Sequence, residues 1–362
     1  MRQQFASYIR DPETKTGLDL KVLERDSEHV VSGVLTNDAS WYPIIAGVPR
    51  LLMGDLKTDL LRRNFEFLER FDTALPERAR HDWHAVRSSI DNVDAFLEHQ
   101  RRTAESFAYE WEQIYRENEF ERENFFHFLH PFVRSEDLVG RTTLDIGCGS
   151  GRFTKWAALS GASAAFGSDI GESVAVAYQM TRDIPNACIV QADIYSMPFE
   201  RQFDFAYSIG VLHHLPKPEE GFSKLPHVLS PGGRMLIWVY NRRNNGRALY
   251  LYEPLRSVLR RVPKPLLFKL CYIPALAVHG VNAFGRVLGR VGLESLEKNL
   301  PFAYYRNFPF NMKLNDAFDV LATPKSNYYF VEDIRQWFID AGLSSIAAYE
   351  HAEAGITCVG YV

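Results

Sequence analysis

The chain has 362 residues, of which 46% are hydrophobic and 24% are charged, enough for one large domain or two of ordinary size. A formal net charge of -4 gives no whole-chain electrostatic footprint for nucleic acid, so we expect no nucleic-acid partner. The four cysteines are scattered without a C-x-x-C pair, which predicts neither a zinc cluster nor disulfides. The chain has no apolar run of ~18 residues and no signal-peptide core, so we expect a cytoplasmic protein without membrane spans.

The first 139 residues divide into two predicted units. Two β-like runs, Leu18–Leu23 and Val30–Leu35, and the segment WYPIIAGVPRLL after them predict a small β-rich domain over residues 1–55. Apolar residues in roughly helical spacing predict a charged helical connector over residues 56–139. Within the connector, SFAYEWEQIY at 106–115 concentrates four aromatic rings.

The stretch LDIGCGSG at 144–151 follows a β-prone run and leads into a helical segment that begins at Arg152. Its glycines, Gly147, Gly149 and Gly151, permit positive φ and let a ligand approach the backbone at the carboxyl end of a strand. The third glycine falls one residue too early for the dinucleotide fingerprint, and the Lys-Ser/Thr pair of a phosphate-binding loop is missing. The stretch therefore predicts a nucleotide-type site that binds neither NAD nor ATP.

An acidic residue that opens the motif, Asp145, and the lack of a phosphate anchor suit a cationic ligand with an amino-acid end. The pattern resembles the first motif of class I, seven-strand S-adenosylmethionine (SAM)-dependent methyltransferases. This resemblance implies an α/β fold with a doubly wound, mostly parallel Rossmann-like sheet, SAM as cofactor and S-adenosylhomocysteine as product. It implies that Asp145 lies near the methionine part of SAM. The backbone expected beneath the ligand comprises Gly147, Cys148, Gly149 and Gly151.

The next two strands supply further candidate contacts to SAM. Asp169 follows a predicted strand at the point where an acidic side chain can accept both ribose hydroxyls, and the alternative is a helix N-cap. The resemblance implies that Asp193 meets the adenine amino group while Ile194 packs on the ring. The remaining expected cofactor contacts are Ile170, Ser208, Ile209, Gly210 and, unless they are simple core residues, Tyr109 and Trp111.

The segment IGVLHHL at 209–215 lies at the carboxyl edge of the fourth predicted core strand, Phe203–Ser208. Because histidine titrates near neutral pH, His213 and His214 are the candidate catalytic residues, as a general base or as a contact to substrate. The alternative is that one of the two histidines packs beneath the loop.

The N-terminal domain has a resemblance of its own. Its segment YPIIAGVPRL at 42–51 is similar to the closing motif of a small zinc-ribbon-like domain that accompanies many bacterial methyltransferases. The sequence Asp11-Pro12-Glu13-Thr14 stands where that domain has its cysteine pair. Since the thiolate ligands are missing, we expect a degenerate, metal-free scaffold.

Residues 140–240 form the predicted SAM-binding core, which a helix and a reversed hairpin at 328–362 complete. Between them, 241–327 is a long insertion whose segment 242–298 has eleven Lys or Arg against three acids. A substrate lid is favoured, and peripheral membrane contact and homodimerisation are the alternatives. The candidate lid contacts are Arg242, Arg243, Tyr304, Tyr305 and Arg306.

These observations predict a methyltransferase that acts on a small-molecule acceptor by direct displacement, with catalysis mainly by positioning. An RNA or protein methyltransferase and a non-catalytic SAM-binding scaffold are the alternatives. The first would favour a basic groove or an N-P-P-Y acceptor motif after strand four, where this chain has Ser208-Ile209-Gly210-Val211.

Overall fold

The computed structural model describes residues 1–362 except 88–119, 244–258, 260–261, 323–325 and 353–354. Its strands are β1 Asp19–Asp26, β2 His29–Thr36, β3 Trp41–Ile45, β4 Val48–Leu51, β5 Thr142–Ile146, β6 Ala164–Asp169, β7 Ala187–Ala192, β8 Phe203–Ile209, β9 Leu229–Tyr240, β10 Ser344–Glu350 and β11 Gly355–Tyr361. Its α-helices are α1 Gly54–Arg63, α2 Phe65–Phe71, α3 Glu77–Arg87, α5 Glu121–Leu129, α6 Arg152–Leu159, α7 Val174–Thr181, α8 Pro218–Lys224, α10 Lys264–Arg290, α11 Glu294–Lys298, α12 Phe310–Ala322 and α13 Val331–Asp340.

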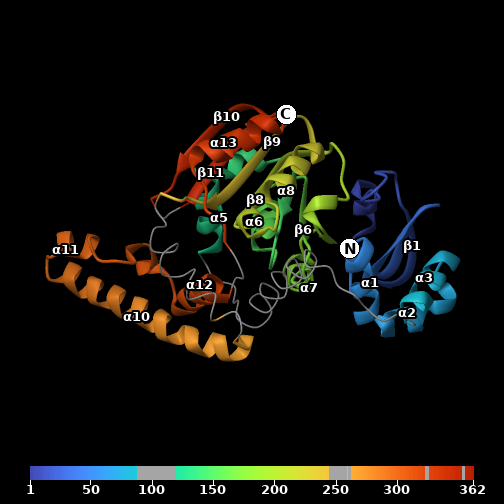
Figure 1. Ribbon diagram of the computed structural model, residues 1–362, viewed down its shortest axis with the longest axis horizontal. Helices are drawn as coiled ribbons and strands as arrows, with labels where there is room; N and C mark the ends of the chain where they lie inside the picture. The colour runs from blue at the N-terminus through green and yellow to red at the C-terminus, as the bar shows by residue number, and fades with distance from the viewer. Residues whose placement is uncertain (88–119, 244–258, 260–261, 323–325, 353–354) are drawn as a thin grey trace.

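The strands form one sheet in the order β1-β2-β3-β4-β7-β6-β5-β8-β9-β11-β10. Its centre, from β7 to β9, is parallel, and β11 lies antiparallel between β9 and β10. Both faces are covered: α5 and α6 pack on one through Phe125 and Phe153, while α8 and α13 pack on the other through Phe222 and Phe338. A buried parallel sheet needs this double cover. The predicted doubly wound fold with a reversed terminal hairpin is confirmed (Figure 1).

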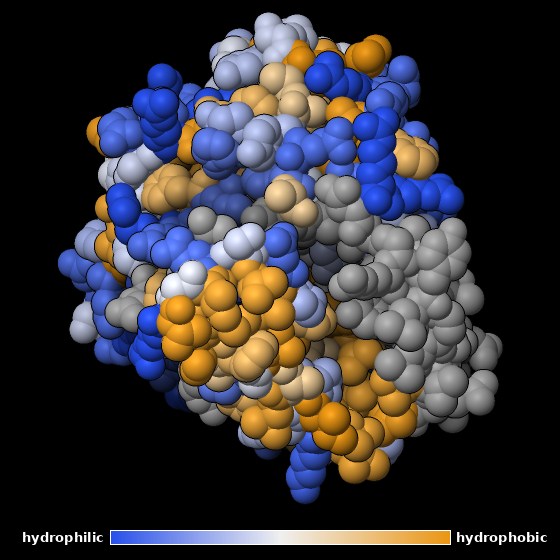
Figure 2. Space-filling model, turned by 90° about the vertical axis from the view of Figure 1, so that its left-hand side faces the viewer, coloured by the Kyte–Doolittle hydropathy of each residue, from blue (hydrophilic) through white to orange (hydrophobic). Residues whose placement is uncertain are grey.

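The insertion after β9 is helical in its described part. The long helix α10 packs against α12, with Leu267 and Cys271 against Leu314 and Phe318. This pair lies apart from the sheet (Figure 1), and apolar surface gathers on the lower half of the face seen in Figure 2, the level at which α10 and α11 lie. Helix α10 is long and apolar enough to cross a bilayer by length and composition, a feature that the search for an unbroken apolar run did not identify.

The N-terminal strands continue the core sheet. Strands β1 to β4 form an antiparallel meander, and β4 then pairs in parallel with β7, which places Arg50 opposite Gln191. Phe5, from the 3-10 helix Gln3–Tyr8, packs edge-on against Phe166 of β6 with ring centroids 5.3 Å apart. The first 55 residues therefore share both a sheet and a hydrophobic core with the rest of the molecule.

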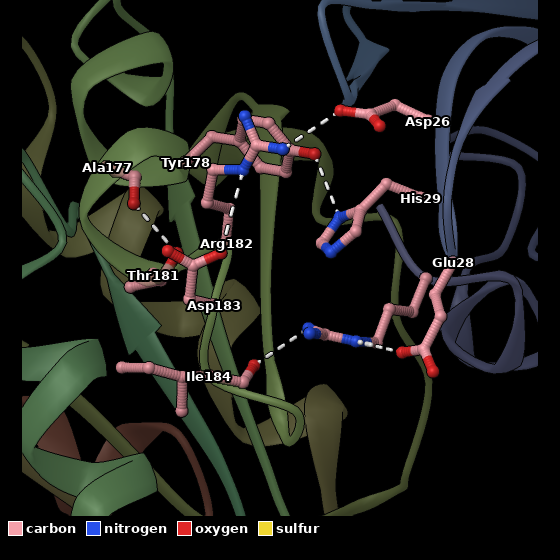
Figure 3. Close-up of polar contacts among 10 residues, drawn as sticks. Asp26, Glu28, His29, Ala177, Tyr178, Thr181, Arg182, Asp183 and Ile184 are labelled. Atoms are coloured by element: carbon pink, nitrogen blue, oxygen red, sulfur yellow. Dashed lines mark hydrogen bonds and ion pairs between the residues drawn. The ribbon is translucent and has the colours of Figure 1, made fainter.

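Polar contacts between the N-terminal strands and α7 surround this junction (Figure 3). The Tyr178 hydroxyl lies 2.9 Å from Nδ1 of the buried His29, and Arg182 pairs with Asp26 at 3.1 Å. Arg2 donates a hydrogen bond of 2.9 Å to the carbonyl oxygen of Ile184, just after α7. The N-terminal unit is thus held against the helix that follows the Asp169 loop.

Candidate functional site

The loop between β5 and α6 has the backbone shape that its glycines predict. Gly147, Gly149 and Gly151 all have positive φ, at 77°, 53° and 80°. A Cβ on Gly147 would lie 2.3 Å from Cγ2 of Val211, so the two loops approach too closely for any side chain. The amide of Gly147 donates to the carbonyl of Ser168 at 2.7 Å, which fixes the loop to β6. The loop is thus held, largely buried, at the carboxyl edge of the sheet.

A cavity of about 140 Å³ opens above this edge, where β5, β6, β7 and β8 end. Nine of the predicted cofactor contacts line it, namely Gly147, Cys148, Gly149, Asp169, Ile170, Asp193, Ile194, Ile209 and Gly210. Because these residues come from four separate strand ends, only the parallel order of the sheet brings them together.

Asp169 lies half-buried at the wall of the cavity. Its Oδ2 accepts a hydrogen bond from the Gly149 amide at 3.0 Å, and its Oδ1 accepts one from the Gly171 amide at 2.8 Å. It does not cap α7, whose N-cap is Ser173, so the alternative considered from sequence does not apply. Burial raises the pKa of Asp169, and the hydrogen bonds from Gly171 and Gly149 oppose that rise. A carboxylate has about four lone-pair sites, so acceptor capacity remains for a ligand.

Asp193 and Ile194 form the opposite part of the wall, directly after β7. Asp193 Oδ1 accepts a hydrogen bond from the Tyr195 amide at 3.1 Å and so caps a single 3-10 turn, Ile194–Ser196. Ile194 is buried and presents an apolar surface to the cavity. This pairing of an acceptor with an aliphatic side chain suits a flat, amino-bearing ring.

Three predicted contacts lie beneath the cavity. Asp145 is 2% exposed, and its Oδ2 accepts a hydrogen bond of 2.8 Å from Thr154 in α6. Gly151 precedes α6 and packs against Ala177 of α7. Ser208 donates to the carbonyl of Ile146 at 2.9 Å and thereby joins β8 to β5. These residues support the loop, while Tyr109 and Trp111 lie outside the described residues.

The two histidines differ in position. His214 lines the cavity, and its Nδ1 lies 3.4 Å from the Ser326 hydroxyl. His213 is fully buried, with its ring centroid 3.9 Å from that of Tyr240, and its carbonyl accepts hydrogen bonds from Asn327. Tyr240 in turn stacks on Tyr328 at 5.6 Å. One histidine therefore faces the site and the other packs beneath the loop, within an aromatic cluster.

The cavity also includes residues that the motif analysis did not select. Arg152 and Phe153, in the first turn of α6, lie on its wall, as do Val211, Leu215 and Pro216 after β8. The first helical turn after a glycine loop points toward the same strand edge, and this geometry could have identified Arg152. Among the predicted lid contacts, Arg306 pairs with Glu297 at 3.2 Å.

A second omission is a buried polar chain that reaches the cavity loop from the N-terminal unit. Nη1 of Arg50 lies 2.8 Å from Glu172 Oε2 and donates to Gln191 Oε1 at 2.9 Å. Gln191 Nε2 donates to the carbonyl of Ile170 at 2.9 Å. The segment that follows Asp169 at the end of β6 is therefore tied to a residue of β4.

The cavity fits SAM in three respects. Positive-φ glycines leave room for a ligand against the backbone, Asp169 retains acceptor capacity, and Asp193 and Ile194 form an edge for a base. A sulfonium cation would also gain from the two carboxylates on the wall.

Comparison with known proteins agrees with this geometry. Residues 144–237 match the family described as "Methyltransferase domain". The tRNA U34 carboxymethyltransferase of Idiomarina loihiensis is 33% identical over 109 residues, which cover 28% of this chain and 33% of that protein. The Klebsiella pneumoniae enzyme of the same name is 33% identical over 106 residues, covering 28% and 31%. The chain thus spans about a third of the length of the curated relatives it matches.

Among solved structures, magnesium protoporphyrin IX methyltransferase from Synechocystis PCC 6803 has a TM-score of 0.43 and 16% identity, covering 74% of this chain and 99% of that one.

These relatives overturn two expectations from the sequence. We expected a small-molecule acceptor and no nucleic-acid partner, whereas the relatives are named as enzymes that modify tRNA. The nature of the cofactor is unaffected, since the matched region contains the glycine loop and Asp169. The chain contains a class I SAM-dependent methyltransferase domain, and its cofactor is S-adenosylmethionine.

Proposed function

We propose that this protein transfers a methyl group from SAM to a nucleotide of RNA, with tRNA as the first acceptor to test. The observation that carries the proposal is the similarity of the catalytic region to tRNA-modifying enzymes. The aromatic side chains and the exposed arginine beside the cavity support the same class of acceptor.

In this proposal the cavity residues divide the cofactor among them. The backbone from Gly147 to Gly149 lies beneath the methionine part, and Asp169 accepts hydrogen bonds from the ribose. Asp193 accepts from the adenine amino group while Ile194 packs on the ring. When bound, SAM supplies a methyl group on a sulfonium that is already a good leaving group. The residues around it therefore need mainly to align the acceptor and exclude water.

Aromatic side chains lie on the cavity wall and behind it, where His213 is fully buried and Tyr240 and Tyr328 are half-buried. His214 lies on the cavity wall, and the rings of His213, Tyr240 and Tyr328 continue from it as an aromatic cluster. RNA-binding proteins commonly stack unpaired bases on such rings, at ~1 to 3 kcal/mol per base. We propose that an acceptor base turned out of its stack contacts His214. If the acceptor atom carries a proton, His214 accepts that proton.

Two exposed cations follow directly after β9. Arg243 pairs with Glu332 at 3.4 Å and with Glu350 at 3.7 Å, so Arg242 is the better candidate for a phosphate. Arg242 and Arg243 are exposed, and both guanidinium groups lie over the ring of Phe330, at 5.3 and 6.0 Å. The Arg242 amide donates to the Tyr329 carbonyl at 2.8 Å, which fixes the segment beside the aromatic cluster. Base stacking beside a basic edge is the usual arrangement for single-stranded RNA.

The test is transfer of label from methyl-labelled SAM to total tRNA, followed by digestion to nucleosides and mass spectrometry. Mass spectrometry also distinguishes a methyl group from a carboxymethyl group, the group after which the related tRNA enzymes are named. We expect labelled tRNA, and about a hundredfold slower transfer for His214→Ala with SAM affinity unchanged. The matched control His227→Ala alters an exposed histidine in the turn before β9. Tight SAM binding without any label in RNA would refute the proposal.

We also propose that residues 1–55 are a degenerate zinc ribbon that folds without metal. Asp11 is fully buried and accepts hydrogen bonds from the amides of Glu13 and Thr14, each at 2.9 Å. These bonds hold the turn that a thiolate-bound ion holds in a zinc ribbon. Chelator treatment should leave the melting temperature unchanged, and stoichiometric zinc in elemental analysis would overturn the proposal.

A further inference from the structure

Helix α10 is apolar on two opposite faces. Its inner face, which includes Leu267, Cys271 and Ala275, is buried against α12. Its outer face is exposed, and Ile273 is 70% accessible to solvent. The large side chains on the outer face are Leu266, Leu270, Ile273, Leu276, Phe284 and Val287. A helix that is apolar all round is ordinarily surrounded by other apolar material, and the described part of the chain covers α10 on one side only.

The exposed residues form one continuous stripe. They recur every three or four positions from Leu266 to Val287, with the small residues Ala277 and Gly280 between them. At 1.5 Å per residue this stripe is about 32 Å long. Monomeric soluble proteins rarely expose contiguous apolar patches of this kind unless the patch binds something. In Figure 1 α10 lies on the outer side of the molecule, and Figure 2 shows apolar surface on the lower half of that side. The stripe is therefore accessible to a partner.

The charge on this helix is of one sign. It contains four cations, Lys264, Lys269, Arg286 and Arg290, and no Asp or Glu, in a chain whose net charge is -4. Lys269 and Arg290 are exposed beside the stripe. An apolar stripe bordered by cations matches the boundary between anionic headgroups and acyl chains.

The same charges disfavour the other occupants. A second copy docked through the same stripe would bring two sets of cations together in a low-dielectric interface. An RNA strand would need a denser row of exposed cations and would leave the aliphatic stripe in water. We propose that α10 lies flat on an anionic membrane surface, with its outer stripe inserted at the headgroup boundary. It does not span the bilayer, because its inner face is packed on α12.

This surface is separate from the cavity, so the inference stands whether or not tRNA is the acceptor. The experiment is co-sedimentation of the full chain with vesicles of phosphatidylcholine alone and of phosphatidylcholine mixed with phosphatidylglycerol. We expect sedimentation with the mixed vesicles, reduced by salt, and about tenfold or more loss of binding for Ile273→Glu. The matched control is Ile339→Glu, on the exposed face of α13, where the side chain is 56% accessible.

Circular dichroism and SAM binding establish that both variants are folded. Failure of the wild-type chain to bind mixed vesicles would overturn the inference, as would equal loss for Ile339→Glu. Sedimentation velocity in which Ile273→Glu converts a dimer to a monomer, without vesicle binding, would assign the stripe to a second copy instead. Loss of tRNA binding in a gel-shift assay with Ile273→Glu, again without vesicle binding, would assign it to RNA.

Discussion

Replacing Arg50 by methionine tests whether the N-terminal unit controls the cofactor site. Arg50 is 4% exposed and contacts Glu172 and Gln191, and Gln191 anchors the carbonyl of Ile170 on the cavity wall. Methionine keeps most of the apolar stem and removes the guanidinium. The substitution therefore isolates the polar chain from the packing of β4.

The magnitude follows from what each partner loses. Gln191 is 2% exposed, so water cannot easily replace the donor that its Oε1 loses. Leaving this buried oxygen without a donor costs about 1 to 3 kcal/mol. The Glu172 side chain is 37% exposed, and solvent takes over its carboxylate at small cost. We expect the free energy of unfolding to fall by about 2 kcal/mol. Without this anchor, SAM has to order the segment around Ile170 when it binds. If that ordering costs about 1.4 kcal/mol, the affinity for SAM falls tenfold.

Urea unfolding and calorimetric titration with SAM measure the two effects. The matched control is Arg182→Ala, which removes the partly exposed contact to Asp26 at the same junction without touching the cavity loop. An exposed pair contributes at most about 1 kcal/mol, and SAM affinity should not change. Unchanged SAM affinity in Arg50→Met, or an equal loss in Arg182→Ala, would refute the reasoning.

Three further predictions concern the core of the site. Asp169→Asn should weaken SAM binding about tenfold or more in calorimetry while the fold is kept, because a charge-assisted bond to the ribose becomes a neutral one. Burial raises the pKa of Asp145 to about 7, so its contribution to stability falls as pH rises from about 4 to about 7. The free energy of unfolding of Asp145→Asn should therefore rise by about 2 to 3 kcal/mol relative to that of wild type between about pH 5 and pH 8. Urea unfolding across this range measures it, and the same pH dependence in both proteins would contradict the prediction. Gly147→Ala should abolish SAM binding. Adding Val211→Ala should restore part of it, since the two shortest contacts are removed while the Val211 Cβ stays at 3.0 Å and the positive φ still costs ~1 to 2 kcal/mol.

The sequence predicted those parts of the molecule whose signals are local. The β5 strand, its positive-φ glycines and the start of α6 are adjacent in the chain, and the structure has each where the pattern indicates. Asp169 and Asp193 could be selected because Asp169 ends one buried strand of the parallel sheet and Asp193 directly follows the next. Strand order then brings such positions to one edge without further information.

Contacts that depend on register between distant segments could not be predicted. The pairing of β4 with β7 sets Arg50 opposite Gln191, which are far apart in sequence. Nothing in the local pattern of either strand identifies its neighbour, since both are short and apolar. The motif likewise could not show that Asp145 turns beneath the loop toward Thr154. Side-chain direction at the end of a strand depends on the packing of the following helix.

The wrong expectation about nucleic acid has a physical cause of its own. Net charge is a sum over the whole chain, whereas a ligand at a binding surface interacts mainly with charges within a screening length of about 8 Å. In this protein the signs are segregated, since α10 has four cations and no acid while the chain as a whole is negative. After β9, Arg242 and Arg243 are exposed side by side, and Arg243 also pairs with Glu332 and Glu350. A negative total is therefore compatible with an anionic partner at either surface, and local composition along each exposed element is the better guide to which partner binds.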